Sequence, residues 1–325
     1  MALTLFDKIW NGHVVSRSSG FLDTLYIDTH FINKVTSQSA FETLRKSNMP
    51  IFRTRQTVVI NEPEYTSHIP LNDLERSQLD LLARNCRHFG IEISTHAKNY
   101  DGSLTALPGQ TIVCDPENTD NLGAFGAIAF GVNELEVEQV LASQCLQKRK
   151  PKTMKIEVNG KLDKGLSAQD INHYLVAEIA NQSAKDYFIE FGGDTILSLD
   201  MDGRMAICNI SPKLGAVGGI MAPDKRTFDY LIALGLVPEI GVQNSYPKSW
   251  NTLFSDEKSV FDEVLEFDAE DIRIGNSGVS ILKLANPSSQ IAGDTDNDQT
   301  LKHNDSVRVF EESNVHKTFN GVNPL

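Results

Sequence analysis

Short apolar segments alternate with longer amphipathic segments through the first 150 residues, and this alternation is the strongest constraint on the fold. Strands that alternate with helices form a largely parallel sheet covered by helices, so we predict the α/β class. The predicted strands are residues 25–28, 57–60 and 111–114, and the predicted helices are residues 39–45, 71–89, 123–130 and 134–147.

A second unit is predicted from residue 151 to about residue 275. Its first strand, residues 153–158, leads into Asn159-Gly160, a dipeptide typical of a β-hairpin turn. The segments predicted after it are a helix at 167–179, an apolar segment at 186–191, a helix at 194–199 and a Gly-rich helix at 214–221. Residues 276–325 form a divergent segment with one strand, 279–284, and an acidic run, 293–300, that we expect to be flexible.

Charge narrows the possible partners. The formal net charge of −13 disfavours nucleic acid and anionic membrane surfaces, which require clustered Lys and Arg. The basic run Lys148-Arg149-Lys150 is interpreted as a solvated link between the two units. No basic region followed by a long apolar stretch begins the chain, and no apolar run is long enough to cross a bilayer. We therefore expect a cytoplasmic protein.

Metal-binding patterns are weak. The cysteines Cys86, Cys114, Cys145 and Cys208 lie singly in apolar runs, so we interpret them as reduced core thiols. The histidines His13, His30, His68, His88 and His96 are not paired at metal-ligand spacing. Asp294, Asp296 and Asp298 alternate as in an EF-hand loop, but Gln299 and Asp305 stand where that loop needs Gly and Glu. We expect no metal site.

Several long phrases resemble one family, the large subunit of 3-isopropylmalate dehydratase in the aconitase superfamily. The phrases occur in the family's order from residue 1 to about residue 275. They are residues 4–10, 12–15, 26–28, 42–45, 107–114, 123–131, 136–142, 201–209 and 222–228. The resemblance implies that residues 1–150 and 151–275 are aconitase-like α/β/α domains one and two, and that the third, cluster-bearing domain is absent.

The resemblance also implies a reaction, the isomerisation of 2- and 3-isopropylmalate by loss and return of water at a [4Fe–4S] cluster. Three cysteines of the family's third domain hold that cluster, because thiolates are the ligands of iron–sulfur clusters. One belongs to a Gly-Ser-Cys-Thr-Asn phrase and two to a C-x-x-C pair. None of the four cysteines here lies in either phrase, so we expect no cofactor.

The family's acid–base residues are also replaced. Where the family has Asp-His, this chain has Glu62-Pro63, and a family Gly-Asp-Ser-His-Thr phrase is here residues 115–119, of which only Thr119 matches. A family Glu has become Lys213. The phrases that belong to the fold are preserved, whereas the loops that carry the family's acid–base residues differ. This pattern predicts that the fold is kept and that the hydro-lyase site is lost.

The rewritten loops define candidate cleft residues. They are Glu62, Glu64, Asp115, Glu117 and Lys213. Carboxylates beside an ammonium group can perform acid–base work or bind a polar metabolite. The alternative is that all five are solvated loop residues, with Lys213 balancing the carboxylates.

Three functions remain open from the sequence. The first is a noncatalytic or regulatory homologue that binds a dehydratase small subunit or a small organic acid. The second is a repurposed enzyme of a specialised pathway that acts on an organic or leucine-like acid without a cluster. The third is one half of a split dehydratase, which predicts a cluster after mixing with a separate third-domain chain.

Overall fold

A computed structural model describes residues 2–17, 22–60, 72–93, 104–179, 184–237 and 247–273 of the 325-residue chain. Residues Met1–Ala285 form one compact unit, and a second unit, Asn286–Leu325, lies outside the described residues. The predicted strand at 279–284 and the acidic run at 293–300 therefore also lie outside them. No helix in the described part of the chain has the length and apolar character needed to span a bilayer.

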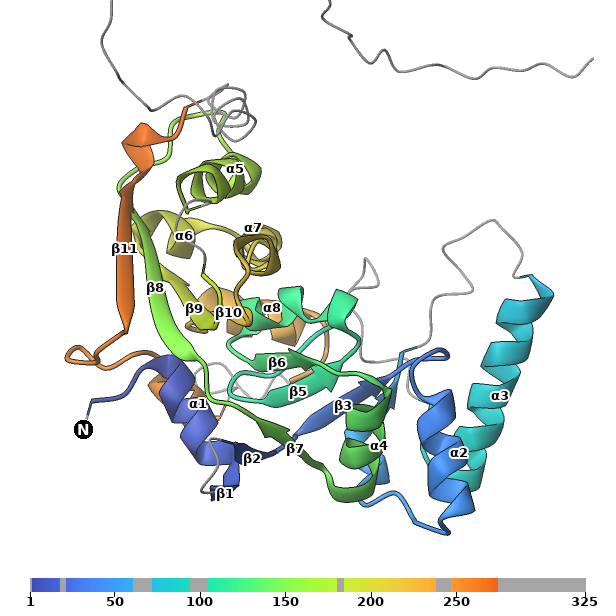
Figure 1. The fold of residues 1–325 in the computed structure, drawn as a ribbon. Coiled ribbons are helices and arrows are strands. Elements are labelled where there is room, and N and C mark those ends of the chain that lie inside the picture. Colours follow the sequence, from blue (N-terminus) through green and yellow to red (C-terminus); the bar gives the residue numbers. More distant parts are fainter. Residues whose placement is uncertain are drawn as a thin grey trace, which may run out of the picture. The chain divides into compact units, whose positions relative to one another are not determined.

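The first sheet is parallel throughout and has the strand order β4-β3-β5-β6 (Figure 1). Its strands are β3 (Thr29–Ile32), β4 (Thr57–Val59), β5 (Thr111–Cys114) and β6 (Ile128–Gly131). The helices α2 (Gln38–Lys46), α3 (Asp73–Phe89) and α4 (Glu134–Ser143) contribute to the apolar core on one face. The opposite face contributes Phe31, Ile112 and Cys114 to a second core. Burial on both faces explains why β5 is continuously apolar.

The second sheet is also parallel, in the order β10-β9-β8-β11. Its strands are β8 (Lys152–Asn159), β9 (Tyr187–Gly192), β10 (Gly218–Met221) and β11 (Glu263–Asp268). The helices α5 (Ala168–Ile179), α6 (Asp194–Ser198), α7 (Met201–Cys208) and α8 (Lys225–Ala233) accompany it. Ile112 of β5 and Ile156 of β8 belong to one core, so the two parallel sheets share an apolar interior. The predicted α/β class is confirmed.

A third, antiparallel sheet joins β1 (Val14–Arg17), β2 (Asp23–Tyr26) and β7 (Cys145–Lys148), and α1 (Leu5–His13) precedes it. The predicted strand at 25–28 was misplaced. The strand ends at Tyr26, and a separate strand, β3, enters the parallel sheet. The predicted helix at 134–147 also ends early, because Gln144 adopts the left-handed conformation with φ 57° and β7 follows. Lys148 is thus part of a strand, not of a solvated link.

Short 3₁₀ helices complete the described chain. They are η1 (Thr54–Gln56), η2 (Pro116–Asn118), η3 (Asp120–Phe125), η4 (Pro212–Leu214), η5 (Lys248–Thr252) and η6 (Ala269–Asp271).

The Gly-rich helix predicted at 123–130 was wrong. η3 ends at Phe125, its C-cap Gly126 has a φ of 77°, and the chain continues as strand β6. The Gly123 backbone lies so close to β10 that a Cβ there would be 1.8 Å from the carbonyl oxygen of Gly219. A short apolar run buried on both faces has no periodicity that separates a strand from a helix.

Two further predictions, the helix at 214–221 and the hairpin at Asn159-Gly160, were also wrong. The helix predicted at 214–221 is a 3₁₀ turn followed by strand β10. Asn159-Gly160 does not form a hairpin, because β8 pairs in parallel with β9 and β11. Gly160, with a φ of 93°, instead turns the chain out of β8.

Candidate functional site

The carboxyl edge of the first sheet is where its topology favours a site. The chain runs from β3 to β4 on one side and then to β5 on the other side of β3. In open parallel sheets, ligands bind outside the carboxyl ends of the strands at such a reversal. The loops that follow β3 and β5 therefore define the candidate site, and Asn33 and Asp115 are the first residues of these loops.

A hydrogen bond joins the two loops. Asn33 Nδ2 donates to Asp115 Oδ2 at 3.1 Å. Asn33 is held in place because its Oδ1 accepts hydrogen bonds from the backbone N–H groups of Val35 and Thr36, each at 2.8 Å. The Asn33–Asp115 hydrogen bond thus connects the two loops at the reversal point, and the turn that follows Asn33 fixes the position of its side chain.

Asp115 is also the N-cap of η2. Its Oδ1 accepts a hydrogen bond from the backbone N–H of Glu117 at 3.1 Å, and Pro116 starts the turn. Capping satisfies a backbone donor that would otherwise lack a partner. Both Asp115 oxygens therefore have structural hydrogen bonds, whereas the side chain of Glu117 is exposed.

The other candidates are less closely connected. Lys213 lies exposed on η4, which packs against α5. Among the described residues, no ion pair or hydrogen bond links Lys213 to Asp115 or Glu117. Glu62 and Glu64 lie outside the described residues.

Two charged residues near this edge were missed from the sequence. Lys34 follows Asn33 and is only 8% exposed, an unusual state for a lysine. Recognising β3 as a strand of its own would have placed Lys34 at the carboxyl edge. Asp120 begins η3, which packs against α7, and its Oδ1 accepts a hydrogen bond from Thr119 at 3.0 Å. Burial raises the pKa of Asp120.

The four thiols were tested as ligands of the iron–sulfur cluster that the resemblance implies. Cluster ligation requires accessible thiolates. Burial raises the pKa of Cys86 to about 11 and also raises the pKa of Cys145. Burial, with the nearby charge of Asp120, raises the pKa of Cys114 and Cys208 further still. Cys86, Cys114 and Cys208 are core groups and Cys145 is half-buried on β7, so the four thiols do not fit a cluster.

Within the described ranges, no three His, Cys, Asp or Glu side chains are arranged to hold a metal ion.

Two of the histidines, His13 and His30, have structural positions. His13 Nε2 lies 2.8 Å from Asp28 Oδ2, and His13 Nδ1 lies 2.7 Å from the carbonyl oxygen of Ile9. Burial alone would lower the pKa of His13, but these two acceptors raise it overall. His30 is fully buried, no residue in the described part of the chain hydrogen-bonds to either ring nitrogen, and burial lowers its pKa to about 3.

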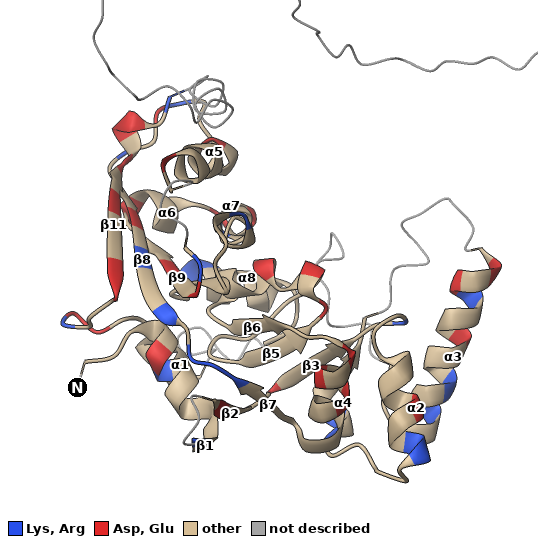
Figure 2. Cartoon of the chain, viewed as in Figure 1, with Lys and Arg blue, Asp and Glu red and all other residues tan. Residues whose placement is uncertain are grey.

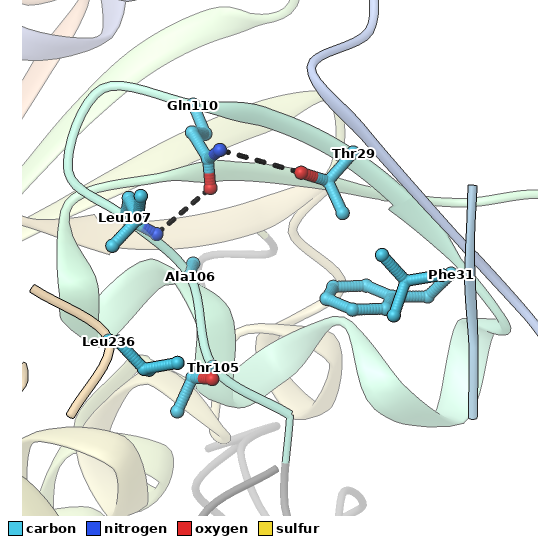
Figure 3. Close-up of a pocket in the computed structure, with 8 residues that line it drawn as sticks. Thr29, Phe31, Thr105, Ala106, Leu107, Gln110 and Leu236 are labelled. Carbon is cyan, nitrogen blue, oxygen red and sulfur yellow. Dashed lines mark hydrogen bonds between the residues drawn. The ribbon is translucent and has the colours of Figure 1, made fainter. Parts of the chain in front are cut away.

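A small pocket of about 170 Å³ opens beside the first sheet (Figure 3). Gln110 crosses one wall, accepting a hydrogen bond from the Leu107 N–H at 2.9 Å and donating to Thr29 Oγ1 at 3.4 Å. The described lining residues are Thr29, Phe31, Val58, Thr105, Ala106, Leu107, Gln110 and Leu236. The three described candidates, Asp115, Glu117 and Lys213, do not line it.

Comparison with known proteins agrees with the fold. The profile of the aconitase family (aconitate hydratase) matches residues 7–319, well beyond residue 275, where the recognised phrases end. The 3-isopropylmalate dehydratase large subunit of Cytophaga hutchinsonii is 40% identical over 332 residues, which cover 98% of this chain and 68% of that protein. The Flavobacterium johnsoniae large subunit is 37% identical over a region that covers 97% of this chain and 71% of that protein. The Bacteroides thetaiotaomicron large subunit is 40% identical over 282 residues, which cover 83% of this chain and 61% of that protein. This chain belongs to the aconitase family.

Proposed function

We propose that this chain is a noncatalytic relative of the 3-isopropylmalate dehydratase large subunit, with no iron–sulfur hydro-lyase site of its own. The observation that carries the proposal is the state of the thiols. All four cysteines of the chain lie among the described residues, and burial raises the pKa of each. A buried thiol with a raised pKa is a poor source of the thiolate that iron requires.

The loop after β5 supports the same proposal. Asp115 is engaged by Asn33 and by the Glu117 N–H, and Pro116 has no titratable group. A general acid or base needs a titratable group free to reach the substrate. In this chain the loop after β5 instead contributes hydrogen bonds that hold the carboxyl edge of the sheet together.

The proposed role is binding. A protein that keeps the large-subunit fold can associate with a dehydratase small subunit, or it can hold a small organic acid without converting it. For the organic acid, Lys213 is the candidate cation and Glu62, Glu64, Asp115 and Glu117 are the candidate hydrogen-bond acceptors of the cleft.

A second candidate, a cluster-free enzyme, is favoured by one specific observation. Lys34 is buried at the carboxyl edge, and Asp120 has a pKa raised by burial. Buried charged groups in such a position are typical of acid–base sites. In this candidate, Lys34 and Asp120 are the first residues to replace, because Lys34 is a buried charge and Asp120 is a half-buried carboxyl group with a raised pKa.

The test is a mixing experiment. The chain is combined with the dehydratase small subunit of its own host under anaerobic conditions, and complex formation is followed by size-exclusion chromatography. Turnover of 2-isopropylmalate is followed in the same samples. A complex without turnover is the expected result for a noncatalytic partner. Turnover by the mixture contradicts the proposal, and turnover of another acid that is lost in Lys34→Met supports the second candidate.

A further inference from the structure

Two stretches of this acidic chain carry only positive charge. Residues 43–56 contain Arg45, Lys46, Arg53 and Arg55 and no carboxylate, and residues 81–91 contain Arg84 and Arg87 and no carboxylate. The whole chain has 43 acidic residues against 30 Lys and Arg. The charge of these two stretches is therefore opposite to that of the protein as a whole.

The fold brings the two stretches together. α2 and α3 are neighbours in the same core, where the rings of Phe41 and Phe89 stack with centroids 5.5 Å apart. Arg45 of α2 donates a hydrogen bond from Nη2 to Asn85 Oδ1 of α3. Figure 2 shows positive charge toward the C-terminal end of each helix, whereas the first turn of α3 is acidic. We call the exposed residues Arg45, Lys46, Arg53, Arg84 and Arg87 the basic patch.

The basic patch is poorly neutralised. Among the described residues, Lys46 is its only member in an ion pair, with Glu42 one turn earlier at 2.8 Å. Cations in the last turn of a helix complement the helix dipole, which accounts for Arg45, Lys46 and Arg87. It does not account for Arg53, which lies outside any α-helix with its guanidinium 5.0 Å from the centre of the Phe52 ring.

Two large apolar side chains lie exposed in the same stretch. Met49 is 41% exposed and Phe52 is 56% exposed. Their backbones are fixed, because the Met49 N–H donates to the Leu44 carbonyl at 2.9 Å and the Phe52 N–H donates to the Leu141 carbonyl at 3.0 Å. Arg, Met and aromatic residues are the types enriched at protein–protein interfaces. Two exposed apolar side chains on fixed backbone, in a stretch whose only charged residues are cations, are therefore suited to a partner that is both acidic and partly apolar.

We propose that the basic patch, with Met49 and Phe52, is a docking surface for an acidic protein segment that carries an apolar side chain. Charge complementarity selects an acidic partner, because the basic patch is positive although the chain as a whole has a net charge of −13. The repulsion from distant carboxylates is screened beyond about 8 Å at physiological salt, so the local charge dominates.

The surface is separate from the candidate site. α2 begins shortly after the carboxyl end of β3 and ends before the chain returns to the start of β4. Its last turn therefore lies toward the amino edge of the sheet, whereas Asn33 and Asp115 lie at the carboxyl edge. Docking at the basic patch does not depend on the proposed function.

The test uses the full chain and a fluorescein-labelled octa-glutamate peptide with one central phenylalanine. Fluorescence anisotropy is measured at low salt and at about 150 mM NaCl. We expect saturable binding that weakens with salt and a Kd raised about tenfold or more in the double variant Arg84→Glu, Arg87→Glu. Phe52→Ser keeps the charge, and we expect it to raise the Kd as well.

The matched control is Lys161→Glu, Lys164→Glu, which makes the same charge change at exposed positions outside the basic patch. It should leave the Kd within about twofold, since steering by net charge alone is weak at this salt. Equal loss in the control and patch variants overturns the proposal. So does the absence of binding, and so does preference for a single-stranded oligonucleotide, which would mark a phosphate-binding surface instead.

Discussion

Asn33 and Asp115 lie at the ends of two neighbouring parallel strands, and the 3.1 Å hydrogen bond between their side chains spans the point where the strand order reverses. In an open α/β sheet, this point is the usual place for a ligand. Here it is closed by an amide and a carboxylate whose remaining polar atoms stabilise their own loops. The pair should therefore contribute to stability.

Replacing Asp115 with Ala removes the N-cap of η2 and leaves Asn33 without its acceptor. We expect a loss of about 1–3 kcal/mol in the free energy of unfolding, measured by urea denaturation. A double-mutant cycle with Asn33→Ala should give a coupling energy of about 0.5–1.5 kcal/mol. Glu117→Gln, at an exposed neighbour, should change stability by less than about 0.5 kcal/mol. Strict additivity of Asn33→Ala and Asp115→Ala would show that the hydrogen bond contributes nothing.

Gly123 allows η3 and β10 to pack at backbone contact. In Gly123→Ala, the new Cβ would lie 1.8 Å from the Gly219 carbonyl oxygen, so the two halves of the core must separate. We expect a loss of about 3 kcal/mol or more in thermal or urea unfolding. The matched control is Gly12→Ala in α1, where nothing lies within 4 Å of the new Cβ. It should be stabilising by about 0.5–1 kcal/mol, and similar losses in both variants would contradict the packing argument.

His30 predicts a loss of stability in acid. Its pKa is about 3 in the folded chain against 6.5 for an unburied histidine, so the unfolded state takes up the proton first. The free energy of unfolding should therefore fall as pH drops from 6.5 toward 3, by up to about 1.4 kcal/mol per pH unit. His30→Leu should show a shallower fall between pH 6.5 and 5. Parallel pH profiles for the two proteins would exclude a neutral, buried His30.

His13 predicts the opposite trend. Hydrogen bonds to Asp28 and Ile9 outweigh burial and raise its pKa above 6.5 in the folded state. Its contribution is therefore complete below pH 6.5 and is lost as pH rises through the folded pKa. His13→Gln should be more destabilising at pH 6 than at pH 8.5 in urea denaturation. An equal cost at both values would mean that the His13–Asp28 contact does not depend on the imidazole charge.

The helices beside the first sheet were largely predictable, because their apolar residues recur at helical spacing and their first residues are typical helix caps. α3 was placed within two residues, since its apolar side chains recur at helical spacing and Asn72 begins a capping box. β6 and β10 were mistaken for helices because each is a short run of Gly and apolar residues. Their extended form follows from parallel pairing with β5 and β9, strands that local sequence does not reveal as neighbours.

The candidate site was less predictable than the fold. Asp115 was identified because its loop departs from the family phrase, but its hydrogen bond to Asn33 depends on β3 and β5 being neighbours. Lys34 drew no attention in the sequence because no apolar pattern around it indicates that its side chain is only 8% exposed. Tertiary packing, which local patterns do not encode, decides both features.

The measurement that tests the central claim most directly is native mass spectrometry of the full chain purified anaerobically from its own host. The account predicts a protein mass without iron or inorganic sulfide, alone or with a partner subunit, because three of the four thiols are buried, Cys145 is half-buried, and the pKa values of all four are raised. A single chain that carries the mass of a [4Fe–4S] cluster would contradict it.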